Sequence, residues 1–380
     1  MNHDLIYLDY NATTPVDPRV LEAMLPYLAV HYGNPSSDHV VGQRAKAAVE
    51  AARAEVAALI GATPAEIIFT GCATEANNLA LLGAARAALP SGRTLLVTSA
   101  IEHPSVLQPL RHMAREGWSL TELPVDAAGR VQVDHAANLI TPEVALVSAM
   151  LANNETGSLQ AVRALADLAH AAGALMHVDA AQAVGKVVVD VDALGADLLT
   201  LAGHKFYAPK GVGALYVRTG VALEPIQYGA GHENGLRPGT ENVPHIVALG
   251  EAARLARTRL AQEAARMTAL RDRLHGLLAA AIPGLRLNGH PTERLPNTLN
   301  ISFPAVAGWQ LLAAASTVAA STGSACHAGD HAASGVLAAM GLTPEAAAGA
   351  VRLSLGRFTT GSEIDRAAGA LIGAWKSLAA

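Results

Sequence analysis

Short apolar runs alternate with amphipathic stretches along the first part of the chain. The runs are too short and too continuous for amphipathic helices, so each is read as a buried strand. Helical stretches such as 75–89 and 161–172 lie between them, and this alternation predicts an α/β domain with a largely parallel sheet. Polar residues collect just after the strands, at the edge where open α/β sheets bind their ligands. The predicted strands cover 66–70, 93–100, 144–150, 174–180, 197–203 and 213–218.

The pattern changes over residues 244–281, where apolar residues recur at helical spacing and charged residues fill the remaining face. This stretch predicts one long helix, or two in series, that leaves the first domain. A second α/β segment follows, with apolar runs at 297–303 and 350–358. The second segment predicts a smaller domain after the long helix.

Length and composition restrict the class of protein. A chain of 380 residues exceeds a single comfortable core, so we expect a large domain over 13–250 and a smaller α/β domain formed by 1–12 and 251–380. The net charge of −5 argues against direct binding of nucleic acid or of an anionic membrane. No apolar run could cross a bilayer, and the first residues do not resemble a signal peptide. Two cysteines, Cys72 and Cys326, exclude a disulfide framework, and we expect a cytoplasmic protein.

The first candidate site is the turn at Ala73 and Thr74, where a predicted strand ends and a helix begins. Free N–H groups and the positive end of the helix dipole make such a turn an anion site, and Thr74 adds a hydroxyl. An ordinary helix capped by Thr74 is the plainer interpretation, and for this segment taken alone it is the favoured one.

Two further candidates follow later strands. Asp179 ends an otherwise apolar strand, where a carboxylate is costly unless it caps the strand or meets a bound cation. Lys205 follows another apolar strand and is one of only five lysines, with Lys210 in a nearby loop as the runner-up. Burial lowers the pKa of a lysine and leaves a neutral nucleophile that can form a Schiff base. An anion site, an aspartate and a semi-buried lysine are the parts that pyridoxal 5'-phosphate requires.

Ten segments match, in order and over nearly the whole chain, the motifs of one known family. Each is weak alone, but the ordered set is specific. The segments are YLDYNATTP (7–15), GNPSSDH (33–39), FTGCATEANNLAL (69–81), IEHPSVL (101–107), NNETGSLQ (153–160), HVDAAQAVGK (177–186), GHKFYAPKGVG (203–213), RPGTEN (237–242), STGSAC (321–326) and VRLSLGRFTT (351–360).

With these segments the chain resembles the cysteine desulfurases of the aminotransferase class V family. The GSAC sequence is similar to the NifS/IscS-like subgroup, which includes housekeeping and nitrogen-fixation enzymes. The resemblance implies the fold type I of pyridoxal-phosphate-dependent transferases, with a mainly parallel central sheet in the large domain and a smaller C-terminal α/β domain. It also implies a homodimer.

The resemblance also implies a role for each residue that contacts the cofactor. Lys205 would bind the cofactor covalently, while His103 would stack on its ring and help to move protons. Asp179 would keep the ring nitrogen protonated and Gln182 would bind the ring oxygen. Thr74 and His204 would hold the phosphate, and Thr240 would reach the site from the neighbouring subunit. The whole implied cofactor set is Ala73, Thr74, His103, Asn154, Asp179, Gln182, His204, Lys205 and Thr240.

On the substrate side, the resemblance implies that Asn154 and Arg352 bind the substrate carboxylate, a task that suits the fork of donors on arginine. Asn34 would lie near this pocket. Each residue has a plainer interpretation: Asn154 as a turn cap, Arg352 as the partner of a surface acid, and Thr240 as a helix cap. We set these aside because the whole set coincides.

Cys326 is the implied sulfur carrier. Its thiolate would attack the sulfur of L-cysteine after Lys205 removes the Cα proton, leaving a persulfide on Cys326 and alanine as product. A loop over about 321–334, rich in small residues, would allow the cysteine to travel between the cofactor and an acceptor.

Three departures from the family pattern stand out. Ala202 replaces a serine that usually donates to the phosphate, which predicts a loss of about 0.5–1.5 kcal/mol in cofactor binding. Cys72 replaces a glycine; it would strain the turn if the position needs positive φ, and would otherwise be a small buried filler rather than a reactive thiol. The third departure is the loop after Cys326, which carries His327, Asp330 and His331.

Side chains spaced as tightly as those of Cys326, His327, Asp330 and His331 rarely reach one metal ion together. We therefore expect no metal site, and favour a role for His327 in lowering the pKa of the neighbouring thiol. A solvated polar loop is the alternative.

The sequence thus predicts a cysteine desulfurase that delivers sulfur to an acceptor protein. Selenocysteine lyase or another class V enzyme is the alternative activity, and a non-catalytic sulfur-transfer scaffold is the alternative from another class of protein. The acceptor is left open among iron–sulfur cluster assembly, transfer-RNA thiolation and DNA phosphorothioation. The absence of a basic patch favours a protein as the direct acceptor.

Overall fold

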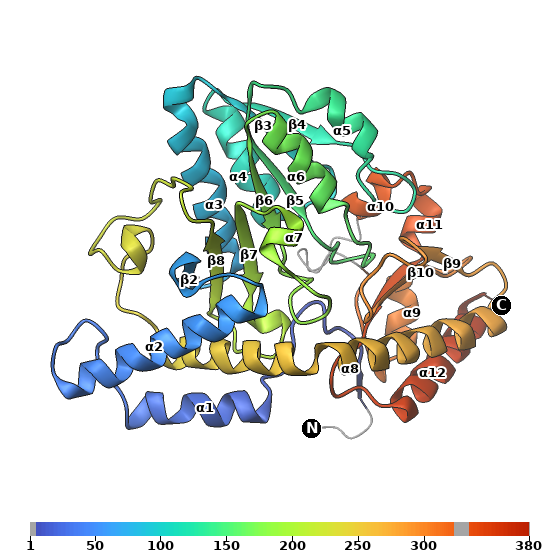
Figure 1. The fold of residues 1–380 in the computed structure, drawn as a ribbon. Helices are drawn as coiled ribbons and strands as arrows, with labels where there is room; N and C mark the ends of the chain where they lie inside the picture. Colours follow the sequence, from blue (N-terminus) through green and yellow to red (C-terminus); the bar gives the residue numbers. More distant parts are fainter. Residues whose placement is uncertain (1–4, 323–333, 380) are drawn as a thin grey trace.

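The computed structural model describes residues 5–322 and 334–379 (Figure 1). The expectations for Cys326, His327, Asp330 and His331 lie outside these residues. The described chain forms a large sheet flanked by helices and, beyond it, a smaller sheet with helices of its own.

The central sheet has seven strands in the order β2-β8-β7-β6-β5-β3-β4. Only β8 runs antiparallel to its neighbours, so the prediction of a largely parallel sheet is confirmed. All six strands predicted for this region are present. The seventh, β4, was missed because it is a half-exposed edge strand with little apolar patterning. The strands are β2 (Ile67–Thr70), β3 (Leu95–Ser99), β4 (Ser119–Leu123), β5 (Val144–Met150), β6 (Leu175–Asp179), β7 (Leu198–Ala202) and β8 (Gly213–Val217).

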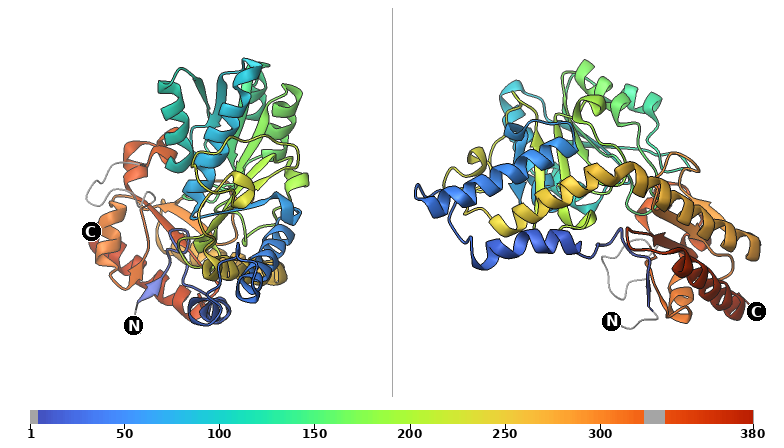
Figure 2. Two further views of the ribbon diagram at one scale, coloured as in Figure 1. Left: turned by 90° about the vertical axis from the view of Figure 1, so that its left-hand side faces the viewer. Right: turned by 60° about the horizontal axis from the view of Figure 1, so that its bottom comes forward.

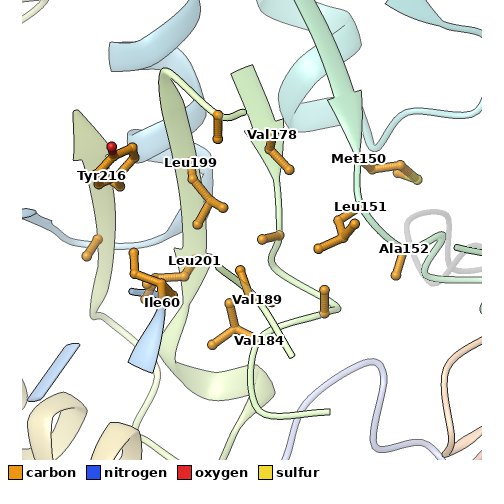
Figure 3. Close-up of a cluster of buried hydrophobic side chains, with 14 of the residues drawn as sticks. Ile60, Met150, Leu151, Ala152, Val178, Val184, Val189, Leu199, Leu201 and Tyr216 are labelled. Carbon is orange, nitrogen blue, oxygen red and sulfur yellow. The ribbon is translucent and has the colours of Figure 1, made fainter. Parts of the chain in front are cut away.

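Helices cover both faces of this sheet because successive residues of each strand point to opposite sides. In β5, Leu146 packs in the layer with α3 and α4, whereas Val147 packs in the layer with α2, α6 and the first half of α8 (Val243–Ala281). Figure 3 shows part of the second layer, where Val178, Leu199 and Leu201 converge with loop residues. The large-sheet helices are α1 (Pro18–Ala29), α2 (Val40–Leu59), α3 (Ala73–Ala88), α4 (Pro104–Arg115), α5 (Val133–Leu139), α6 (Val162–Ala171) and α7 (Val191–Leu194).

The smaller part is built around an antiparallel sheet in the order β12-β10-β9. The start of the chain joins it, since β1 pairs with β11 and Ile6 and Leu8 lie in its core. In contrast, α10 places Val336 and Leu337 in the core of the large sheet, and α11 places Ala347 there. The predicted domain limits stay a prediction. The elements are β1 (Ile6–Tyr7), β9 (Arg286–Asn288), β10 (Thr298–Ser302), β11 (Val318–Ala319), β12 (Ala350–Ser354), α9 (Gly308–Ala314), α10 (Gly335–Ala339), α11 (Pro344–Ala348) and α12 (Gly361–Ala379).

A single helix, α8 (Val243–Ala281), connects the two parts. It runs continuously over 39 residues, so the prediction of one long helix, rather than two in series, is correct. Its first half buries residues such as Leu249 in the core of the large sheet, and its second half buries Leu274 and Leu278 in the core of the small sheet. Figures 1 and 2 show it lying beneath the large sheet and extending to the smaller part. Among the helices described, none is long and apolar enough to cross a membrane.

Candidate active site

A cavity of about 770 Å³ opens at the carboxyl ends of the parallel strands, where the sequence pattern placed the ligand site. It also receives residues from the chain start, from α10 and from β12. The structure therefore brings together most of the residues singled out in the sequence. Those that line the cavity are Ala73, Thr74, His103, Asn154, Asp179, Gln182, His204, Lys205 and Arg352.

The anion-binding end of the cavity is the N-terminus of α3. Cys72, not Thr74, is the N-cap residue, so the interpretation of Thr74 as an ordinary cap is wrong. The φ of Cys72 is −175°, an extended conformation that any residue adopts, and no strain arises there. Its side chain is exposed and lines the cavity, so the expectation of a buried filler is also wrong. The absence of a side-chain cap leaves the first N–H groups of α3 for a ligand.

His204 lies beside this anion-binding end. Its Nδ1 is 3.1 Å from the Thr13 hydroxyl. Burial, together with the nearby Lys205, Lys210 and Lys186, lowers the pKa of His204 to about 4. The imidazole is therefore neutral at neutral pH and can contact an anion only as a hydrogen-bond donor.

Asp179 ends β6 and is buried at the floor of the cavity. Its Oδ2 accepts a hydrogen bond from Asn77 Nδ2 at 3.0 Å, and its Oδ1 accepts one from the Ala181 N–H at 2.9 Å. Both donors are neutral, so these contacts hold the carboxylate in place and leave its charge to pair with a cationic ligand group.

Lys205 lies in a 3₁₀ turn (Gly203–Lys205) directly after β7 and is half-buried, as predicted. Its Nζ donates to the carbonyl oxygens of Asn11 and Ala12, at 2.7 Å and 3.0 Å. Lys210, the runner-up, is exposed. The turn therefore places the amine at the cavity wall on a short, rigid support.

Lys186 is a second amine next to the site, and the sequence reasoning missed it. It is more deeply buried than Lys205 and donates to Gln182 Oε1 at 2.6 Å and to Asn11 Oδ1 at 3.3 Å. Burial, reinforced by the charges of Lys205 and Arg352, holds the pKa of Lys186 well below its usual range. Lys186 stands four residues after Gln182 within the segment 177–186 that matches the family, and this position could have pointed to a role at the site.

Asn11, also missed, joins the parts of the site. Its carbonyl oxygen accepts from both Lys205 Nζ and Gln182 Nε2, and its side-chain amide donates to the Asn154 carbonyl and to Thr298. Its side-chain oxygen accepts from Asn297 at 3.0 Å. Because Asn297 and Thr298 belong to the smaller part of the molecule, Asn11 couples that part to the lysine.

Arg352 lies in β12, is buried and lines the cavity. One terminal nitrogen donates to the Asn154 carbonyl at 3.0 Å, and the other pairs with Asp9 at 2.7 Å. Its partner is thus the half-buried Asp9 rather than a surface acid. A guanidinium has five N–H donors, so donors remain for a substrate carboxylate.

Glu102 is a buried carboxyl group that also lines the cavity. Its Oε1 accepts from the Ser99 hydroxyl and from the Met150 N–H, while Oε2 is buried without a partner among the described residues. Burial raises the pKa of Glu102 to about 8. Glu102 directly precedes His103 in the chain, and no chemical role was predicted for it from the sequence.

Two predicted residues do not reach the cavity of their own chain. Asn34 is exposed and caps a turn by accepting from the Ser36 N–H. Thr240 is exposed, and the N-cap of α8 is Asn242 rather than Thr240. Cys326 lies outside the described residues. Within the part of the chain that the structure describes, no cluster of His, Cys, Asp or Glu side chains is arranged to hold a metal ion.

Residues 6–367 match the Aminotransferase class-V family, and the chain belongs to that family. It is 48% identical over 364 residues to "Cysteine desulfurase 2" of Trichormus variabilis, covering 95% of this chain and 91% of the relative. It is 45% identical to "Cysteine desulfurase NifS" of Azotobacter vinelandii, covering 95% and 90%. A solved structure described as "NIFS-LIKE PROTEIN" superposes with a TM-score of 0.91 at 36% identity, covering 97% of this chain and 98% of that one.

Within the family, the chain falls in the NifS/IscS-like group of cysteine desulfurases. The fold class and the activity expected from the sequence are therefore confirmed. The role of each individual residue stays a prediction.

Proposed function

We propose that the cavity holds pyridoxal 5'-phosphate and L-cysteine side by side, and that Cys326 takes up the sulfur. The observation that carries the proposal is the meeting of four features in one cavity: an anion-binding helix terminus, Asp179, Lys205 and Arg352. These features suit, in turn, a phosphate, a protonated ring nitrogen, an aldehyde and a substrate carboxylate.

The residues present fit this cofactor. The α3 terminus with Thr74 and His204 would hold the phosphate, and the buried Asp179 would pair with the ring nitrogen. Gln182 Nε2, which already donates to the Asn11 carbonyl at 2.9 Å, has a second N–H for the ring oxygen. When bound, pyridoxal phosphate supplies an acceptor for the negative charge that develops at the substrate Cα.

Arg352 and Asn154 would orient the substrate. The contact of Arg352 with Asp9 holds the guanidinium in a fixed position without using all its donors. A substrate carboxylate bound there would leave the amino group and the Cα hydrogen for Lys205, which lines the same cavity. Lys205 would then accept the Cα proton at Nζ.

Cys326 would perform the sulfur transfer. Its thiolate attacks the sulfur atom of the substrate, so an S–S bond forms while the Cβ–S bond breaks. The electron pair of the broken bond stays with the substrate carbon, which takes up protons to become alanine. Cys326 is left as a persulfide. On the C-terminal side of this loop, Gly335 and Val336 line the cavity.

The partners follow from this chemistry. The persulfide needs a protein acceptor, and the names of the NifS and IscS relatives support iron–sulfur cluster assembly as the pathway. A homodimer in the cytoplasm is part of the proposal.

The test uses Cys326→Ser and Lys205→Ala with L-cysteine as substrate. We expect Cys326→Ser to keep the cofactor absorbance but to lose alanine formation by at least about a hundredfold, because the nucleophile is gone. Lys205→Ala should lose both. Mass spectrometry should find the extra sulfur on the Cys326 peptide of the wild type only.

Undiminished alanine formation by Cys326→Ser would refute the sulfur-transfer step. A clear preference for selenocysteine over cysteine would favour the lyase activity. A colourless wild-type protein after addition of pyridoxal phosphate would refute the cofactor.

A further inference from the structure

The ring of His103 is tied to the start of α4 through one nitrogen. His103 is the N-cap residue of this twelve-residue helix, and its Nδ1 accepts a hydrogen bond from the Ser105 backbone N–H at 3.1 Å. A backbone N–H can only donate, so Nδ1 carries a lone pair and no proton. A neutral imidazole has a single N–H, and in His103 it must therefore be on Nε2.

The Ser105 hydroxyl reinforces this arrangement, because Asn77 determines its direction. Asn77 Nδ2 donates to Asp179 Oδ2 at 3.0 Å and to Ser105 Oγ at 2.9 Å. A carboxylate only accepts hydrogen bonds, so the Asn77 atom that faces Asp179 is the amide nitrogen. Since Ser105 Oγ accepts from Asn77, its own hydrogen is free to point at His103 Nδ1, 2.8 Å away.

The chain of contacts is shielded from water and joins three elements. Asn77 in α3 and Ser105 in α4 are both buried, and Asp179 ends β6. A flipped Asn77 amide would lose both donor contacts, while its Oδ1 has no partner among the described residues in the present orientation. The geometry thus allows one direction of hydrogen bonding from Asn77 to the imidazole.

Charge at the site favours the same protonation state. The positive end of the α4 dipole disfavours a proton on Nδ1. Burial lowers the pKa of His103, Lys205 lowers it further, and Asp179 acts in the opposite sense. The neutral ring is therefore the form that the surroundings stabilise.

We propose that Ser105 and Asn77 are positioning residues that hold His103 as the neutral Nε2–H tautomer, so that the ring serves the site as a hydrogen-bond donor. This rests on the proposed function, in which His103 faces the bound cofactor, and it narrows the implied role of His103. Accepting a proton would require an imidazolium at the N-terminus of α4, so proton transfer at Cα falls to Lys205 alone.

The tautomer is tested by NMR of the holoenzyme labelled with ¹⁵N-histidine, from about pH 6 to pH 8. The His103 signals are assigned by their loss in His103→Gln. We expect a protonated Nε2 throughout and an unprotonated Nδ1 at about pH 7 and above. A protonated Nδ1, or a doubly protonated ring near pH 7, would overturn the proposal.

The positioning role is tested with Ser105→Ala and its matched variant Ser105→Thr. Ser105→Ala keeps the backbone N–H but removes the hydroxyl donor to Nδ1. The pH at which His103 gains a second proton should therefore rise by up to about one unit, and Ser105→Thr, which keeps a hydroxyl, should restore it. The low-pH limb of the kcat profile for cysteine should move with it.

A titration of Ser105→Ala that coincides with the wild type would overturn the role of Ser105. Circular dichroism of both variants separates this result from misfolding. If the wild type fails to release alanine from cysteine, the proposed function fails instead, and the tautomer can still be read from the spectra.

Discussion

Two buried titratable residues near the cavity prefer their neutral forms and make opposite contributions to stability. Burial raises the pKa of Glu102 to about 8 and lowers that of His177 to about 4. His177 lies between the hydroxyls of Ser148 and Thr200, at 2.8 Å and 3.2 Å from its ring nitrogens. Between about pH 4.5 and 8, folded Glu102 keeps a proton that the unfolded chain releases. Between about pH 4 and 6.5, folded His177 stays neutral where the unfolded chain gains a proton.

The variant Glu102→Gln tests the first of these effects. The folded wild type holds a proton that the unfolded chain, with its ordinary carboxyl pKa near 4.5, has released. The stabilisation that comes from this proton is therefore complete below about pH 4.5. As the pH rises toward 8 it is lost, and the free energy of unfolding falls by roughly 1 kcal/mol per pH unit. Glutamine resembles the protonated form and does not titrate. In urea unfolding, we expect the free energy of unfolding of Glu102→Gln, relative to that of the wild type, to increase by at least about 1 kcal/mol from pH 5 to pH 8.

His177 has the opposite sign, because its folded pKa is lowered: its effect is present above about pH 6.5 and is lost as the pH falls toward 4. The two residues partly cancel between pH 4.5 and 6.5, so only the difference between variant and wild type is informative. Parallel stability curves for Glu102→Gln and the wild type would contradict the raised pKa.

At the scale of elements, a buried ion pair anchors the segment 229–242 to the large sheet. Glu233 and Asn234 adopt positive φ angles of 46° and 58° in this segment, a conformation that costs free energy for residues other than glycine. Arg53 of α2 pairs with Glu233 through two hydrogen bonds of 2.7 Å and 2.9 Å and lies over the Phe69 ring. Glu233 also accepts from the Phe69 N–H at 2.7 Å.

We expect Arg53→Met to destabilise the protein by about 3 kcal/mol, because Glu233 would be left buried without its cation. Denaturant unfolding measures this loss. The matched control is Arg163→Met, which breaks an exposed ion pair with Asp167 and should cost less than about 1 kcal/mol. Equal effects of the two substitutions would show that the buried pair does not hold the segment.

At the scale of the whole molecule, two features are left without a role in a single chain. The outer face of α1 exposes Leu21, Leu25 and Leu28, which follow one another at helical spacing. Thr240 is exposed on the anchored segment, outside the cavity of its own chain. Both features agree with the proposed homodimer, in which Thr240 completes the site of the other subunit.

A subunit-mixing experiment tests this arrangement with Lys205→Ala and Thr240→Arg. Each variant alone should be inactive in releasing alanine from cysteine, because the first lacks the amine and the second obstructs the site it reaches. In a mixed dimer one site has both Lys205 and Thr240. Co-expression should therefore restore activity at about a quarter of all sites by random pairing. No recovery in dimers verified by sedimentation would show that Thr240 acts elsewhere.

The elements predicted best are those whose burial requires a local pattern of apolar residues. The strand over 144–150 was predicted to the residue, because a strand covered on both faces requires a continuous apolar run. The edge strand β4 lacks that requirement, and the pairing of β1 with β11 joins residues more than 300 positions apart. Neither leaves a local pattern.

The sequence by itself determined the α/β class, the family and the set of candidate site residues, since strand ends, helix starts and motif spacing are local properties of the chain. Only the tertiary structure decided how these residues meet. It placed Asn11 between Lys205 and Lys186, exposed Cys72 to the cavity, and directed Asn77 and Ser105 toward His103. The reason is physical: burial and hydrogen-bond direction depend on neighbours from other elements, which fix the protonation state of a side chain only once the chain has folded.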